Sequence, residues 1–173
     1  MGLACIHCGE DCGKHPIMWD DKPFCCNGCK TVYQILNQNK LDKYYDIQPM
    51  SGIRVDKVDV GNKYAYLDNE EINEKLLDFS DGGISKVTLF VPTIHCASCI
   101  WLLENLNTLN KSIITSFVNF PKKIVSITYK DTEITLRELV ELLASIHYVP
   151  EITLDQLDKN DSSKSDRDLL IKI

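Results

Sequence analysis

ISKVTLFVPTIHCASCIWLLENLNTL, residues 84–109, is the stretch that decides the fold of the second half of the chain. Apolar residues alternate with others from Val87 to Val91, which is typical of a half-buried strand, and Pro92 ends the run. The motif Cys-Ala-Ser-Cys, from Cys96 to Cys99, falls in the turn beyond it. The residues that then recur at helical spacing are Leu102, Leu103, Leu106 and Leu109. The sequence therefore predicts a helix that begins at or just before Cys99, with the cysteine pair at its N-terminus.

The residues that follow complete a small α+β domain. Two strand-like runs, Ile113 to Phe120 and Ile124 to Tyr129, are separated by a hairpin-like break at Pro121. A capping box at Thr135-Leu-Arg-Glu138 opens a second helix, and Ile152 and Leu154 suggest a last short strand. The buried stripe expected for this helix is Leu136, Leu139, Val140, Leu143 and Ile146. The order β-α-β-β-α-β over residues 84–154 predicts the ferredoxin-like, split βαβ arrangement.

Three further segments complete the expected organisation. Residues 1–46 form a small cysteine-rich unit, with a helix from near Gly28 that ends at the pair Tyr44-Tyr45. Residues 47–83 are glycine-containing and are expected to be a linker with one short amphipathic helix between Asn69 and Phe79. Residues 155–173 are a polar tether that turns apolar at its end. We expect the reading frame to continue from there into a membrane span.

Composition and charge exclude several classes of function. The 19 Lys and Arg are scattered and outnumbered by 25 Asp and Glu, for a net charge of −6, which does not suit a nucleic-acid partner. No run approaches the ~18 apolar residues of a membrane span, so we expect no membrane insertion by these residues themselves. The start, MGLACIHCGE, lacks the basic and apolar regions of a secretory signal. The eight cysteines are therefore expected to be reduced and available for metal binding or redox chemistry.

The pair Cys96 and Cys99 has the features of a soft-metal site. Cu(I) prefers thiolates in low coordination number, whereas Zn(II) takes four ligands, so two thiolates favour Cu(I). A position at a helix N-terminus is expected to lower the pKa of the thiols and to leave them exposed for exchange of the ion. Thioredoxin-like redox sites use the same spacing at the same helix position. The predicted antiparallel module of about 70 residues favours metal over redox chemistry.

A second cluster of cysteines lies near the start of the chain. Cys5-x-x-Cys8-Gly and Cys25-Cys26-x-x-Cys29 form two knuckles, a spacing typical of zinc-knuckle, treble-clef-like sites. Four thiolates close a tetrahedral shell, and a unit this small depends on its metal to fold. Five cysteines compete for four places, so either Cys25 or Cys26 is spare. We favour Cys5, Cys8, Cys26 and Cys29, with Cys25 uncertain and with Cys12 and His15 as possible substitutes. The metal is Zn(II) or Cu(I).

The segments VTLFVPTIHCASCIWLLENL, SFVNFPKKIVSITY and LVELLASIHYVP together resemble the heavy-metal-associated domain of copper-transporting P-type ATPases. More narrowly, they are similar to the branch that supplies copper for assembly of cbb-type cytochrome oxidases, in which Ile-His precedes the first cysteine and Ile-Trp follows the second. FCCNGCKTVYQIL with its Tyr-Tyr ending resembles the cysteine-rich metal-binding domain that precedes the heavy-metal-associated domain in that branch.

The resemblance implies roles for individual residues. Cys96 and Cys99 match the family's metal ligands, and Tyr148 matches the aromatic residue beside the metal loop. His95 stands where the common pattern has Thr, so it is either a third ligand or a residue that tunes the loop. His147 replaces the usual Gly before the aromatic residue, a departure from the family pattern.

The resulting hypothesis is the metal-binding region of a copper-transporting P-type ATPase on the cytoplasmic side of the membrane. Its partners would be a copper chaperone or the other domains of the ATPase. No Asp-Lys-Thr-Gly phosphorylation motif occurs, so we expect no catalytic residue and no ATP turnover by these residues. The alternative is a stand-alone thiol redox or zinc-scaffold protein.

Overall fold

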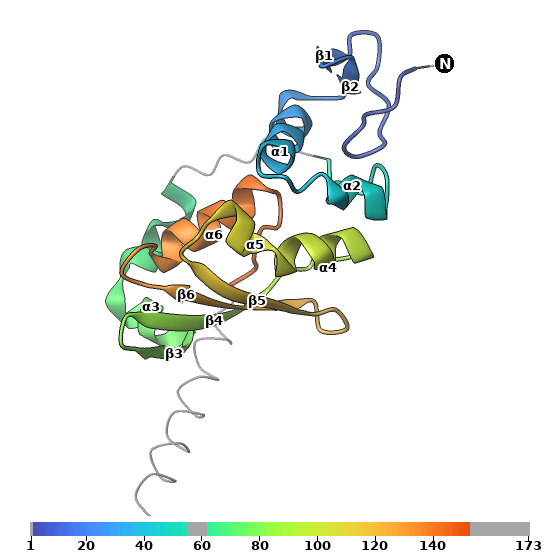
Figure 1. Cartoon of the computed structure of the whole chain (residues 1–173). Coiled ribbons are helices and arrows are strands. Elements are labelled where there is room, and N and C mark those ends of the chain that lie inside the picture. Colours follow the sequence, from blue (N-terminus) through green and yellow to red (C-terminus); the bar gives the residue numbers. More distant parts are fainter. Residues whose placement is uncertain (1, 55–61, 153–173) are drawn as a thin grey trace, which may run out of the picture.

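The computed structural model describes residues 2–54 and 62–152 of the chain. Figure 1 shows a small cysteine-rich unit next to a larger unit, in which helices cover one face of a four-stranded sheet. The small unit contains β1 (Ile17–Trp19), β2 (Lys22–Phe24), α1 (Asn27–Gln38) and α2 (Lys43–Ile47). The larger unit begins with the 3₁₀ helix η1 (Asn62–Asp68), α3 (Glu70–Leu76), β3 (Leu77–Asp81) and β4 (Ile84–Phe90). It continues with α4 (Ala97–Glu104), α5 (Leu106–Leu109), β5 (Ile113–Asn119), β6 (Ile124–Lys130) and α6 (Leu136–Ser145).

The four-stranded sheet is antiparallel throughout, in the order β3-β4-β6-β5. In the two central strands, β4 and β6, every second side chain is buried, and the register places Val87 opposite Ile127 and Leu89 opposite Val125. These side chains pack against the helices, since alternate residues of a strand face opposite sides of the sheet. The helix residues that complete this interior are Leu102 and Leu103 of α4 and Leu139, Val140 and Leu143 of α6.

Several predicted elements are confirmed, and the α+β class with them. The helix after the cysteine motif begins with Cys96 as its N-cap, and both strands after it are present. The capping box of α6 is formed, with the Thr135 side chain accepting from Glu138 N and the Glu138 carboxylate accepting from Thr135 N. No helix in the described ranges is long and apolar enough to cross a bilayer.

The edge of the sheet differs from the expected arrangement. The position beside β4 is occupied by β3, a segment predicted to belong to the linker and to the end of its short helix. Gly82 and Gly83 form the two-residue turn between these strands, with φ of 58° and 79°, and glycine adopts such values without steric cost. For the predicted last strand, the structure shows one isolated bridge between Phe90 and Glu151, while Leu154 lies outside the described residues. The complete ferredoxin-like order therefore stays a prediction.

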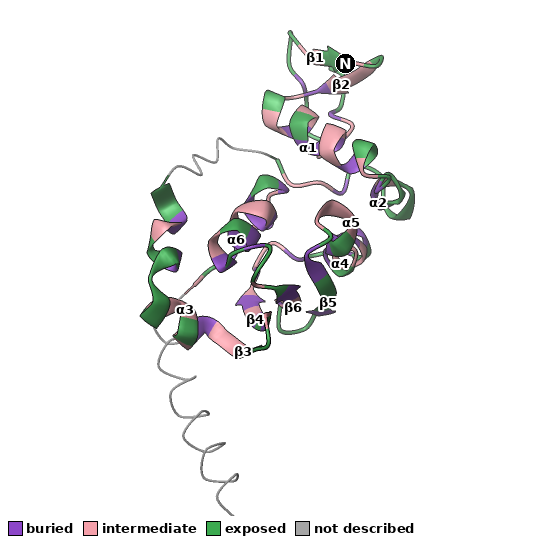
Figure 2. Ribbon diagram, turned by 60° about the vertical axis from the view of Figure 1, so that its left-hand side comes forward, coloured by how far each residue is buried: buried purple, intermediate pink, exposed green. Residues whose placement is uncertain are grey.

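The cysteine-rich unit also differs in one respect. The single helix predicted from near Gly28 to the tyrosine pair is two helices, because Lys40 adopts a φ of 58° and interrupts them. The second helix, α2, carries Tyr44 and Tyr45. Helix α2 packs against α4 of the larger unit, as Figures 1 and 2 show.

The two units share one hydrophobic core. Val32 and Leu36 of α1, together with Leu41 and Tyr44, belong to the same buried cluster as the interior of the larger unit. A second, smaller cluster stays within the cysteine-rich unit and consists of Cys5, Cys12, Phe24, Cys29 and Tyr33. The first unit therefore packs on the second, while the part of it around the cysteines has little apolar material of its own.

Burial of α4 side chains contributes to the free energy of unfolding of the larger unit. Leu102→Ala is expected to lower the free energy of unfolding by about 2–5 kcal/mol, because the Leu102 side chain is fully buried. Phe117→Ala is the matched control, since its ring is 65% exposed and should change stability by only about 0.5 kcal/mol. Urea unfolding followed by circular dichroism measures both. Equal effects of the two substitutions would contradict this assignment of the core.

Candidate metal centres

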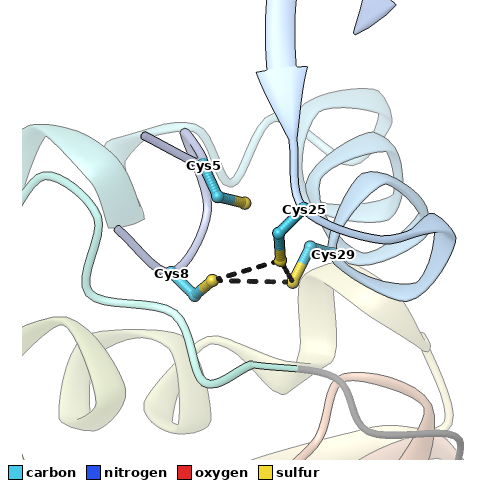
Figure 3. A group of neighbouring side chains, drawn as sticks. All are labelled: Cys5, Cys8, Cys25 and Cys29. Carbon is cyan, nitrogen blue, oxygen red and sulfur yellow. Dashed lines mark hydrogen bonds between the residues drawn. The ribbon is translucent and has the colours of Figure 1, made fainter. Parts of the chain in front are cut away.

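The first centre gathers four cysteines from two knuckles. Cys5 and Cys8 flank a turn that is closed by the hydrogen bond from Gly9 N to Cys5 O, and Gly9 has a φ of 77°. Cys25 follows β2 directly, and Cys29 lies in the first turn of α1. Figure 3 shows the side chains of the four residues turned toward one another. Their sulfur atoms all lie within 4.8 Å of one another.

The spacing of the sulfur atoms fits a tetrahedral metal ion. The Sγ–Sγ distances are 3.7 Å for Cys8–Cys25, 3.6 Å for Cys25–Cys29 and 3.8 Å for Cys29–Cys8. Four thiolates with Zn–S bonds of about 2.3 Å place neighbouring sulfurs about 3.8 Å apart. The side chains therefore stand close to the positions that a four-thiolate Zn(II) site requires.

The structure brings Cys25 into this group, whereas the predicted ligand was Cys26. Cys26 is the N-cap of α1, and its sulfur accepts a hydrogen bond from Cys29 N at 3.4 Å. Capping directs this side chain to the helix backbone, although its sulfur remains 3.9 Å from that of Cys25. Cys12 is buried beside Cys5 but outside the group of four, and His15 is exposed.

Serine substitutions distinguish the two neighbouring cysteines. Cys25→Ser should weaken Zn(II) binding by on the order of 10²–10³-fold, because it removes one of four thiolates from the shell. Cys26→Ser is a matched control, since serine is a good N-cap and preserves the bond from Cys29 N. We expect it to change the affinity by less than about tenfold. Competition with a chromophoric chelator measures both affinities, and the reverse ranking would return Cys26 to the site.

Three of these thiols, Cys5, Cys8 and Cys25, differ in how readily they ionise. Burial acts to raise the pKa of Cys5, but hydrogen bonds from the backbone N–H groups of Cys8, Cys25 and His7 bring it below its ordinary value. Burial raises the pKa of both Cys8 and Cys25. Cys5 therefore ionises more readily than Cys8 or Cys25, which lose their protons as the ion binds.

The second centre lies at the N-terminus of α4. The sulfur of Cys96 accepts a hydrogen bond from Cys99 N at 3.4 Å, and the two sulfurs are 3.0 Å apart. His95 Nδ1 lies 3.6 Å from the Cys99 sulfur and 2.8 Å from the carbonyl oxygen of Thr93. These contacts bring together the three residues that the sequence singled out around the motif.

Two expectations for this pair are wrong. The thiols are not exposed, since Cys96 is only 8% accessible and Cys99 is fully buried. Nor is the pKa of Cys96 lowered. Burial raises it to about 11, and the adjacent Cys99 adds to the effect. Desolvation outweighs the helix N-terminus here because the small unit covers the motif. At neutral pH Cys96 therefore keeps its proton until an ion displaces it.

Residues from three places in the chain surround the pair. Tyr148 is buried, and its pKa is raised well above the ordinary value by burial and by neighbours that include Tyr44 and Cys99. His147 adopts a φ of 66°, so the backbone keeps the left-handed conformation suited to glycine although the residue is histidine. Tyr44 and Ser98 were missed as site residues. The adjacent aromatic pair Tyr44-Tyr45 in the cysteine-rich segment was the available signal.

The comparisons with known proteins add one finding. Residues 4–81, somewhat less than half of the chain, match the family described as "Putative metal-binding domain of cation transport ATPase". The match includes the four gathered cysteines of the first centre and ends within the β3–β4 hairpin. No curated protein and no solved structure gave a significant match. The match supports a metal-binding region of a cation transport ATPase.

Proposed function

We propose that this chain is the metal-binding region of a copper-transporting P-type ATPase, and that Cys96 and Cys99 carry the copper ion as cargo. The premise is the likeness of residues 4–81 to a metal-binding domain of cation transport ATPases. The observation that carries the proposal is the second, separate thiol pair at the start of α4, outside the matched residues. The chain thus contains two thiol centres, one with four cysteines and one with two cysteines and a nearby histidine.

Ligand chemistry assigns a different metal to each centre. Four thiolates at tetrahedral spacing suit Zn(II), which would hold the two knuckles together. Two thiolates, with one histidine nearby, suit Cu(I), which accepts low coordination numbers and soft ligands. Cys96 and Cys99 would bind the ion, and His95 would remain beside it.

Membership of the copper-transporting branch of P-type ATPases would give this region a cellular location and a set of partners. It would lie on the cytoplasmic side of the membrane, and it would receive Cu(I) from a chaperone or pass it to other domains of the ATPase. Transfer between thiol pairs requires the donor's sulfur to approach the ion directly. Access to Cys96 and Cys99 would therefore control the relay.

One observation favours a second candidate, a thiol redox protein. Sulfurs 3.0 Å apart at a helix N-terminus also suit a dithiol that cycles with a disulfide. The raised pKa of Cys96 opposes this function, because thiol–disulfide exchange needs a thiolate as the attacking group.

Titration of the reduced chain with Cu(I), with Zn(II) already in the first centre, tests the proposal. We expect one further equivalent of Cu(I) to resist a competing chelator. A disulfide reduction assay on the same sample should show no activity above a Cys96→Ser control. Disulfide reduction without Cu(I) binding would favour the redox candidate.

A further inference from the structure

Helix α2 of the cysteine-rich unit covers the Cys96/Cys99 pair. The hydroxyl of Ser98, inside the motif, donates a hydrogen bond to the carbonyl oxygen of Tyr44 at 2.8 Å. The hydroxyl groups of Tyr44 and Tyr148 are 3.2 Å apart, and both side chains are fully buried. The views in Figures 1 and 2 agree in placing α2 against α4. The thiol pair is therefore enclosed by residues from both units.

The next residue of α2, Tyr45, contacts the knuckle of the first metal centre. The hydroxyl of Tyr45 lies 2.8 Å from Nδ1 of His7, one of the two residues between Cys5 and Cys8. The Tyr45 ring also packs on the ring of Tyr33, with centroids 4.8 Å apart. Tyr33 belongs to the small cluster that contains Cys5 and Cys29. Two adjacent tyrosines of one short helix thus contact residues beside the two centres, Tyr45 at the first and Tyr44 at the second.

Binding of an ion by Cys96 and Cys99 requires this enclosure to change. With metal–sulfur bonds of about 2.3 Å, an ion between two opposed thiolates holds the sulfurs about 4.6 Å apart. The observed separation is 3.0 Å, and Cys99 has no exposed surface through which a donor thiol could approach. We expect opening of the site to a donor thiol to displace Tyr44, because its hydroxyl lies 3.2 Å from that of Tyr148 and its carbonyl accepts a hydrogen bond from Ser98.

We infer that α2 is an autoinhibitory lid on the Cys96/Cys99 site and that metal in the first centre holds the lid closed. This inference rests on the proposed function, since it concerns access to the same thiol pair. A metal ion fixes the knuckle that carries His7, His7 positions Tyr45, and Tyr45 positions α2 with Tyr44 over the thiols. Loss of that ion loosens the knuckle and releases the lid. The first centre thereby regulates exchange at the second.

Alkylation of the thiols measures the lid without copper. The complete 173-residue chain, loaded with one equivalent of Zn(II), is treated with iodoacetamide, and modification of Cys96 and Cys99 is followed by peptide mass spectrometry. Tyr44→Ala should accelerate modification at least ~tenfold, because it removes a buried aromatic cover. Ser98→Ala, which loses one hydrogen bond, should accelerate it about 2–10-fold. Phe117→Ala, on the far side of the sheet from α4, should match the parent.

Two further variants test the link between the centres. Tyr45→Phe keeps the ring but loses the hydroxyl that contacts His7, so the modification rate should become less sensitive to Zn(II). In the parent chain, removal of Zn(II) should raise the rate at least ~tenfold. Should Tyr44→Ala prove unfolded by circular dichroism, Ser98→Ala and the Zn(II) dependence of the parent decide the matter.

The outcomes separate this inference from the proposed function. A chain that binds no Cu(I) at Cys96 and Cys99 refutes the copper assignment, while the alkylation rates still report on the lid. A chain that binds one Cu(I) there, with the same alkylation rate in the parent, Ser98→Ala and Zn(II)-free samples, refutes the lid. Withdrawal of Cu(I) by a chelator should follow the same order of rates, and a uniform rate would also overturn the inference.

Discussion

Replacing Cys96 and Cys99 together by serine is expected to remove one equivalent of bound Cu(I) and to weaken binding at this site by at least ~10³-fold. Serine oxygen is a hard ligand, and no other thiol among the described residues lies in this group. The fold should persist, since a serine at position 96 still serves as the N-cap of α4. Circular dichroism and urea unfolding check that the structure is retained.

The measurement compares Cu(I) stoichiometry in the parent and the double variant under reductant, against a strong competing chelator. Zn(II) is loaded first, so that the thiols of the first centre are occupied. Cys12→Ser is the matched control, because Cys12 is a buried thiol outside both groups. A double variant that retains the parent's full complement of Cu(I) would disprove the assignment of the copper site.

Removal of the metal from the first centre should unfold the knuckles and leave the sheet intact. The small cluster around the cysteines has only five buried members, so it supplies little hydrophobic free energy of folding. Binding of a structural Zn(II) contributes roughly 10–16 kcal/mol in small zinc domains, which exceeds what such a cluster provides. Residues 2–26 are therefore expected to lose ordered structure when the metal is removed.

Amide signals in a two-dimensional NMR spectrum follow this loss residue by residue. With chelator, signals from the knuckles and from β1 and β2 should lose dispersion, while those from β4, β6 and α6 should stay in place. Cys8→Ser should give the same pattern without chelator, and Cys12→Ser should not. Unchanged signals throughout the chain would show that the metal is not structural.

Much of the local structure follows from the sequence alone. The alternation from Val87 to Val91 and the capping box at Thr135 depend on neighbouring residues, and the structure forms the strand and the helix that they predict. The position of Cys96 at the start of α4 is likewise local. The leucines at helical spacing begin just after the cysteine pair, so the helix they form starts at that pair. The grouping of two knuckles into one centre follows from their spacing.

Other features were decided by how neighbouring elements pack and pair with one another. The choice of Cys25 for the first centre depends on how β2 meets α1, and Cys26 is instead taken up by the helix cap. The place of β3 beside β4 follows from the turn at Gly82 and Gly83. The glycine pair is visible in the sequence, but the strand before it is recognised only when it pairs with β4.

The burial of the Cys96 and Cys99 thiols is the clearest effect of tertiary structure. Local sequence places Cys96 and Cys99 at a helix N-terminus, where the helix dipole lowers the pKa of a thiol. Residues distant in the chain cover them, namely Tyr148 and Tyr44 of α2, and Tyr44 is more than 50 residues away in the sequence. Desolvation by that cover reverses the local effect and raises the pKa of Cys96. Spacing determined which residues form the pair, and packing between the two units determined whether solvent reaches them.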